Sequence, residues 1–150
     1  MDACLNIKMN NSNKNITFDH FVYYTYELIE NSNYLNILEI NNDATTCASG
    51  SKVIKEVYII DKNSKQVINQ DKIKESIDNY DNVIEDLLKF IDTQTEDEQI
   101  YNYAKNQIDN NNYFVYYGQN NNIIFTFINM TGSYNEKYGY DGINFSKIEL

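Results

Sequence analysis

The chain has a single histidine, His20, and most nucleophilic schemes would depend on it. A Cys47–His20 pair oriented by Asp19 or Asp43 would be sufficient for thiol catalysis, because a neighbouring imidazole activates a thiol. The surrounding segment TTCASGSK carries no signature of such a site, and nothing in the sequence brings the two residues together. We therefore interpret His20 as a surface histidine and Cys47 as an ordinary cysteine, and assign no catalytic residue.

Metal and nucleotide sites are not indicated either. Cys4 and Cys47 are too far apart in the sequence to form a Cys-x-x-Cys or Cys/His zinc motif, and they are interpreted as two free thiols. The end of the loop, Gly50-Ser51-Lys52, lacks both the earlier glycine and the Gly-Lys-Ser/Thr order of a phosphate-binding loop. The sequence predicts no metal and no cofactor.

Charge is the strongest chemical feature of the chain. The net charge is -10, the isoelectric point is near 4.4, and all 12 basic residues are lysines. Nucleic-acid binding requires a cationic surface, and arginine supplies most direct base recognition, so direct contact with nucleic acid is disfavoured. A partner that is attracted over long range should be a basic protein.

The acidity is concentrated in residues 71–109, which hold 11 acidic residues and four lysines, a net charge of -7. Carboxylates at helical spacing can bind a metal or perform acid–base chemistry, but these lie off the apolar stripe, and an outward face does not perturb their pKa as catalysis requires. A solvated helix face explains them more simply. A third possibility is that they imitate the phosphates of a nucleic acid and bind a basic groove. The candidate partner-binding residues are Asp78, Asp81, Glu85, Asp92, Glu96 and Asp97.

A second candidate surface is the segment SYNEKYGYDG, which we expect to be a glycine-bearing loop. It contains Tyr134, Tyr138 and Tyr140. Tyrosines on a loop form good interface anchors at low entropic cost. The alternative is that they cover the edge of the core.

The first half of the chain predicts mainly strands. Residues 4–9 alternate apolar and polar side chains, as in a half-buried strand. Residues 18–30 place apolar side chains close to helical spacing and predict a helix. Branched and aromatic runs predict strands at 34–40 and 52–61, and a short strand at 66–69 completes a hairpin.

Two helices should follow. The clearest element starts at residue 71 and has one apolar stripe, formed by Ile73, Ile77, Tyr80, Ile84, Leu87 and Ile91. Thr95 and Glu98 have the spacing of a capping box and predict the start of a second helix that ends near residue 109.

Three more strands are predicted within residues 112–118, 122–130 and 142–150. The middle one has almost no polar residue between Ile123 and Ile128, so it should be a central strand covered on both faces. The prediction is a single α+β domain over residues 1–150. It has a mostly antiparallel sheet of about five to six strands, with a helix pair over about 71–109 and an N-terminal helix packed on it.

These features favour a non-enzymatic binding protein that inhibits or neutralises a basic, nucleic-acid-handling partner through its acidic helical face. An anti-defence protein of the anti-CRISPR kind and a toxin-immunity protein both fit this description. The competing hypothesis is a small enzyme or ligand-binding domain that uses His20, Cys47 or clustered carboxylates. The chain shows no signal peptide and no membrane span, which predicts a cytoplasmic protein, in a host cytoplasm if a virus encodes it.

Overall fold

The computed structural model describes residues 20–45, 52–128 and 136–148 and has an α+β fold with two four-stranded antiparallel sheets. Sheet A has the order β1-β2-β3-β4, and sheet B has the order β5-β6-β7-β8. The expectation of one sheet of five to six strands is therefore corrected to two sheets. The strand predicted over residues 4–9 lies outside the described residues.

Sheet A contains the largest departure from the prediction, because residues 18–30 do not form a helix. Strand β1 (His20–Glu30) pairs with β2 (Tyr34–Thr45) along its whole length. The segment is rich in aromatic and β-branched residues, which favour strands, and its apolar residues lie on both sides of the strand rather than on one helical stripe. Strands β3 (Lys52–Asp61) and β4 (Gln66–Ile68) complete the sheet where the sequence predicts them.

Three helices connect the two sheets. The predicted first helix is divided into α2 (Gln70–Glu75) and α3 (Tyr80–Gln94), because Asn79 has a left-handed backbone with φ 54°. Helix α4 (Glu98–Asp109) follows, and its N-cap is Asp97, whose side chain accepts a hydrogen bond from the Gln99 N–H. The predicted Thr95–Glu98 capping box is thus displaced, and Thr95 accepts from the Asp97 N–H instead.

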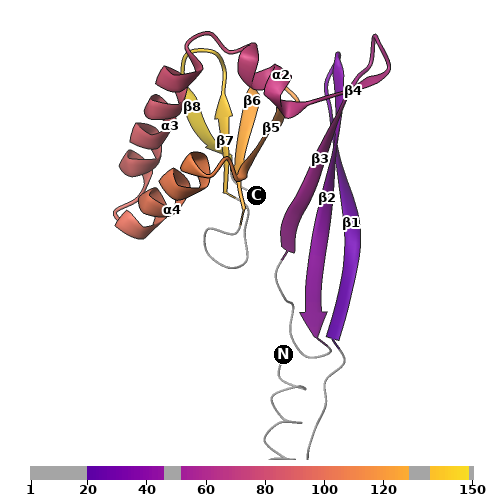
Figure 1. The fold of residues 1–150 in the computed structure, drawn as a ribbon, viewed down its shortest axis with the longest axis horizontal. Coiled ribbons are helices and arrows are strands. Elements are labelled where there is room, and N and C mark those ends of the chain that lie inside the picture. The colour runs from indigo at the N-terminus through magenta and orange to yellow at the C-terminus, as the bar shows by residue number, and fades with distance from the viewer. Residues whose placement is uncertain (1–19, 46–51, 129–135, 149–150) are drawn as a thin grey trace, which may run out of the picture.

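Sheet B consists of β5 (Tyr113–Tyr117), β6 (Ile123–Phe127), β7 (Glu136–Tyr140) and β8 (Phe145–Ile148). As predicted, β6 is central and buried on both faces. Figure 1 shows α3 and α4 on one side of sheet B and the long strands of sheet A on the other, with β1 farthest from the helices. Buried side chains from both sheets and from the helices belong to one hydrophobic cluster.

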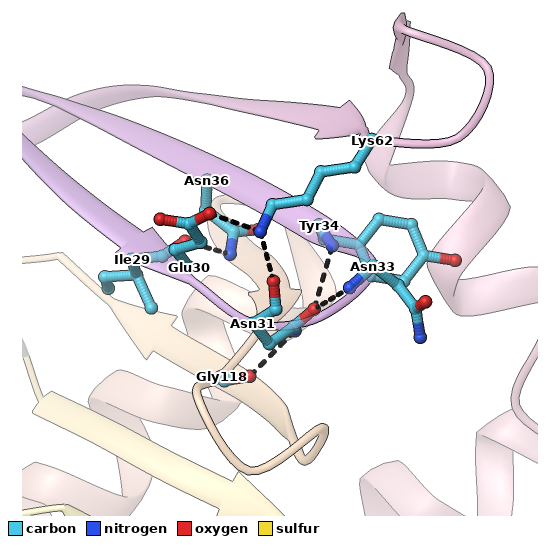
Figure 2. A network of polar contacts seen from close by, with 8 residues as sticks. All are labelled: Ile29, Glu30, Asn31, Asn33, Tyr34, Asn36, Lys62 and Gly118. Carbon is cyan, nitrogen blue, oxygen red and sulfur yellow. Dashed lines mark hydrogen bonds and ion pairs between the residues drawn. The ribbon is translucent and has the colours of Figure 1, made fainter.

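Two buried asparagines join the sheets, and Figure 2 shows them close to the β1–β2 turn. The Asn31 side chain donates to the Gly118 carbonyl at 2.9 Å and accepts from two backbone N–H groups of its own turn. The Asn36 side chain, which is fully buried, donates to the carbonyls of Ile29 and Tyr117. These bonds hold the β5–β6 turn against sheet A.

Candidate functional site

The six predicted partner-binding carboxylates are all exposed, and they lie on helix α3 or close to one of its ends. Asp81, Glu85 and Asp92 lie on α3 at spacings of four and seven residues, which places them within an arc of about 40°. Asp78 directly precedes α3, and Glu96 and Asp97 lie between α3 and α4. We call this set, Asp78, Asp81, Glu85, Asp92, Glu96 and Asp97, the acidic ridge.

The charges of the acidic ridge are not neutralised by the part of the chain that the structure describes. Among the described residues, no ion pair involves a ridge carboxylate. Asp92 also lies in the last turn of α3, which contains no basic residue. A carboxylate at a helix C-terminus opposes the helix dipole, so this position is unfavourable for stability. Folding therefore does not explain the placement of Asp92.

The tyrosines predicted as a second surface are placed differently. The segment expected to be a loop forms β7, where Tyr138 is 2% exposed and packs edge-on against Phe90. Tyr140 is half-buried, and its ring is stacked 4.8 Å from that of Phe145. Tyr134 lies outside the described residues. Burial raises the pKa of Tyr138 to about 12, with a smaller contribution from Glu136, so this side chain is a neutral part of the core.

The alternative catalytic groups do not converge in the described structure. His20 is exposed at the start of β1 and contacts the carboxylate of Asp43 on β2. Cys47 lies outside the described residues. Within the described ranges, no group of three His, Cys, Asp or Glu side chains is close enough to hold a metal ion.

The structure reveals a pocket of about 470 Å³ that the sequence did not indicate. It lies between the end of β1 and the face of sheet B that is turned away from α3 and α4. Its lining residues are Glu27, Ile29, Tyr116, Gly118, Gln119, Asn120, Asn122, Ile124, Lys137, Ser146 and Ile148. The side chains of Asn122 and Ser146, which line the pocket, pack closely over Gly139, because a Cβ atom on Gly139 would lie 2.8 Å from the Asn122 side chain and 3.3 Å from that of Ser146.

Lys137 is the least expected residue of this pocket. It is 6% exposed, and its ammonium lies 3.9 Å from the Glu27 carboxylate. This distance exceeds the 2.7–2.9 Å of a charge-assisted hydrogen bond. No hydrogen bond to the Lys137 ammonium is formed by any other residue within the ranges 20–45, 52–128 and 136–148. A buried ammonium whose donors are not used by the described residues can bind an acceptor group of a ligand.

Tyr116 and Thr126 carry hydroxyl groups on the same face of sheet B as Lys137, and Thr126 is directly opposite Lys137 in the β6–β7 pair. The pKa of Tyr116 is raised to about 12, mainly by burial; the nearby Thr126 hydroxyl lowers this pKa and Glu27 raises it, each to a smaller extent. That hydroxyl is buried and has no hydrogen bond of normal geometry to a described residue. The only signal for the pocket in the sequence was Lys137, which lies at a buried position of β7. We expected a loop in this segment, so the sequence did not predict that this lysine is buried.

No protein-family model, curated protein or solved structure matches this chain. Among the described residues, no helix is long and apolar enough to cross a membrane. The acidic ridge and the Lys137 pocket are the two features of the described structure that bear on function.

Proposed function

We propose that the chain is a non-enzymatic binding protein whose acidic ridge occupies a basic surface of a nucleic-acid-handling partner protein. The observation that carries this proposal is the position of Asp92. Together with Asp81 and Glu85 it forms an exposed, unpaired stripe on α3, although its place at the helix C-terminus is unfavourable for stability. Sites at which local stability rules are broken are often functional.

The arrangement of the charges in one row supports imitation of the anionic backbone of a nucleic acid. Helix α3 has 15 residues and is about 22 Å long. The three ridge carboxylates on this helix, Asp81, Glu85 and Asp92, are separated along its axis by about 6 Å and about 10 Å, which is wider than the spacing of about 3.4 Å along one strand of DNA. Asp78, Glu96 and Asp97 extend the row beyond the two ends of the helix. A groove that binds a phosphate backbone through lysines and arginines would therefore find a row of anions, although a sparser one. Occupation of that groove would block the nucleic acid, which suits an anti-defence or toxin-immunity role.

The proposal is tested by affinity capture from the native host with two charge-reversal variants. The ridge variant carries Asp81→Lys and Glu85→Lys. The control variant carries Glu56→Lys on β3 and Asp86→Lys, which lies on α3 outside the ridge and pairs with Lys89. Both variants change the net charge by the same amount, so a non-specific charge effect would be equal in the two.

We expect the wild-type chain and the control variant to retain the same basic protein, and we expect rising salt to release it. The ridge variant should lose this protein. Equal capture by the ridge variant and the wild type would contradict the proposal, because the partner would then bind a different surface.

A second candidate function, the binding of a small molecule, is favoured by the Lys137 pocket. Its volume lies in the range of ligand sites, about 300–1,000 Å³. The lining carries one positive and one negative charge, from Lys137 and Glu27, in addition to neutral amides and hydroxyls. A protein with a net charge of -10 repels anions. The ligand that fits both facts is a small zwitterion of the amino-acid class, with its carboxylate at Lys137 and its ammonium near Glu27.

The test is titration with free amino acids, followed by NMR chemical shifts, with propionate and ethylamine as probes of the separate charges. We expect saturable binding of an amino acid, and weak or no binding of the two probes. Lys137→Met should abolish the binding, whereas Lys147→Met, which removes a half-exposed lysine of β8, should not. Ser146→Leu, which fills the pocket and leaves both charges in place, should also abolish it. Equal binding of propionate, or binding unaffected by Ser146→Leu, would exclude this function.

A further inference from the structure

Strand β1 exposes more apolar surface than any other element that the structure describes. Six large side chains of this one strand are each 48–63% exposed: Phe21, Val22, Tyr23, Tyr24, Tyr26 and Leu28. They lie on both faces of the strand, because neighbouring residues of a strand point to opposite sides. In Figure 1, β1 is the outer strand of sheet A, on the side away from α3 and α4. Contiguous exposed apolar surface of this kind marks an interaction site.

The edge of β1 also lacks the features that keep edge strands apart. Soluble proteins protect such edges with lysine, proline, bulges or very short strands. β1 is 11 residues long, contains no lysine or proline, and pairs with β2 without any register shift. The opposite edge of the same sheet, β4, has only three residues. Within the described ranges β2 is the only strand that pairs with β1, which is therefore an edge strand of sheet A.

We propose that β1 pairs antiparallel with β1 of a second copy of this chain, with the two-fold axis at Thr25, which joins the two copies of sheet A into one continuous sheet. In this register each residue meets a suitable partner: Phe21 with Ile29, Val22 with Leu28, Tyr23 with Glu27, and Tyr24 with Tyr26. Aromatic and β-branched pairs of this kind stabilise neighbouring strands. A two-fold contact must be self-complementary, and the sequence of β1 meets this condition about Thr25.

Charge does not oppose this contact, although the chain is strongly acidic. The nine residues from Phe21 to Ile29 contain one charged side chain, Glu27. The acidic ridge lies on the other side of the molecule, beyond sheet B (Figure 1). The ends of the strand are complementary as well. His20 contacts Asp43 at one end of β1, and Glu30 pairs with Lys62 at the other end. Antiparallel pairing about Thr25 places the His20–Asp43 pair of one copy next to the Glu30–Lys62 pair of the second copy.

The exposed area is sufficient for a dimer. A large apolar or aromatic side chain has a surface of roughly 150–250 Å². Half of that area on six side chains gives roughly 600 Å² of exposed surface per copy, so the pair can bury at most about 1,200 Å², which reaches the size of a small specific interface. The dimer would leave both acidic ridges free, so it would present two partner-binding surfaces.

The first test is a cysteine cross-link at the proposed axis. Thr25→Cys is made in a chain whose native cysteines are replaced by Cys4→Ser and Cys47→Ser, and Val67→Cys on β4 serves as the control. Opposite residues of an antiparallel pair have Cα atoms about 4.5–5.5 Å apart, within the range of a disulfide. We expect Thr25→Cys to form a covalent dimer under mild oxidation and Val67→Cys to remain monomeric. Equal cross-linking of the two variants, or none at Thr25→Cys, would overturn the proposal.

The second test measures self-association by analytical ultracentrifugation over a concentration series. Tyr24→Lys with Tyr26→Lys should raise the dissociation constant of the dimer at least about tenfold. Val67→Lys is the matched control, because Val67 is 66% exposed on the opposite edge strand. It should leave the dissociation constant unchanged. A wild-type chain that is monomeric throughout the micromolar range, or a dimer that is lost only with Val67→Lys, would contradict the proposal.

Discussion

The substitution Asp92→Lys should stabilise the fold and weaken partner binding at the same time. A charge in the last turn of a helix contributes about 0.3–1 kcal/mol, unfavourable for an anion and favourable for a cation. Asp92 lies in the last turn of α3, so replacing its negative charge by a positive one removes an unfavourable interaction with the helix dipole and adds a favourable one. Repulsion from Lys89, three residues earlier, subtracts about 0.2–0.5 kcal/mol. We expect the free energy of unfolding to rise by roughly 0.5–1 kcal/mol.

Urea unfolding at low and high ionic strength measures this change, and Glu85→Lys is the matched comparison. Glu85 belongs to the same stripe but lies in the middle of α3, where the helix dipole has little effect. Both variants should weaken partner capture, and only Asp92→Lys should raise the free energy of unfolding, with a smaller rise at high salt. Stabilisation by Asp92→Lys without any loss of binding would show that the ridge is an ordinary solvated face. Destabilisation would refute the helix-dipole reasoning.

Three further substitutions or conditions test the fold that supports these surfaces. Asn31→Ala removes the hydrogen bond to Gly118 and two turn bonds, and should lower the free energy of unfolding in urea by about 2–3 kcal/mol. Gly118→Ala places a Cβ atom 2.1 Å from Asn122 Oδ1 and should cost about 1–3 kcal/mol, a loss that a second substitution, Asn122→Ala, partly reverses in thermal melts. Burial raises the pKa of Tyr116 and of Tyr138 to about 12, against about 10 in the unfolded chain, so the contribution of these two tyrosines to stability should be fully present below about pH 10 and be lost as the pH rises from about 10 to about 12. Urea unfolding of the wild-type chain and of Tyr116→Phe over this pH range measures the loss.

Local patterns in the sequence predicted several elements well. Strand β3 spans the predicted residues 52–61, and β6 is the central strand that its continuous apolar run indicated. The ridge carboxylates are exposed on the helical segment as expected, although a left-handed Asn79 divides the predicted first helix. In these regions the local pattern and the tertiary packing favour the same structure.

Other features could not be predicted from local patterns. The apolar residues of β1 fit both a helix and a strand, and pairing with β2 decides between them. The pocket brings Glu27 and Lys137 together from the two sheets, so no motif along the chain reveals it. The glycine- and tyrosine-rich composition around Tyr138 predicted a loop, whereas Glu136–Tyr140 form β7, and this strand buries Lys137 beside a carboxylate.

The most direct test of the acidic ridge is the affinity of the captured basic partner for the wild-type chain and the ridge variant, measured at several salt concentrations. We expect wild-type affinity to fall steeply with rising salt, because ridge carboxylates pair with lysines and arginines of the partner. The ridge variant should bind more weakly, and its affinity should depend less on salt. Equal affinities and equal salt dependence for the two chains would contradict the proposed role of the ridge.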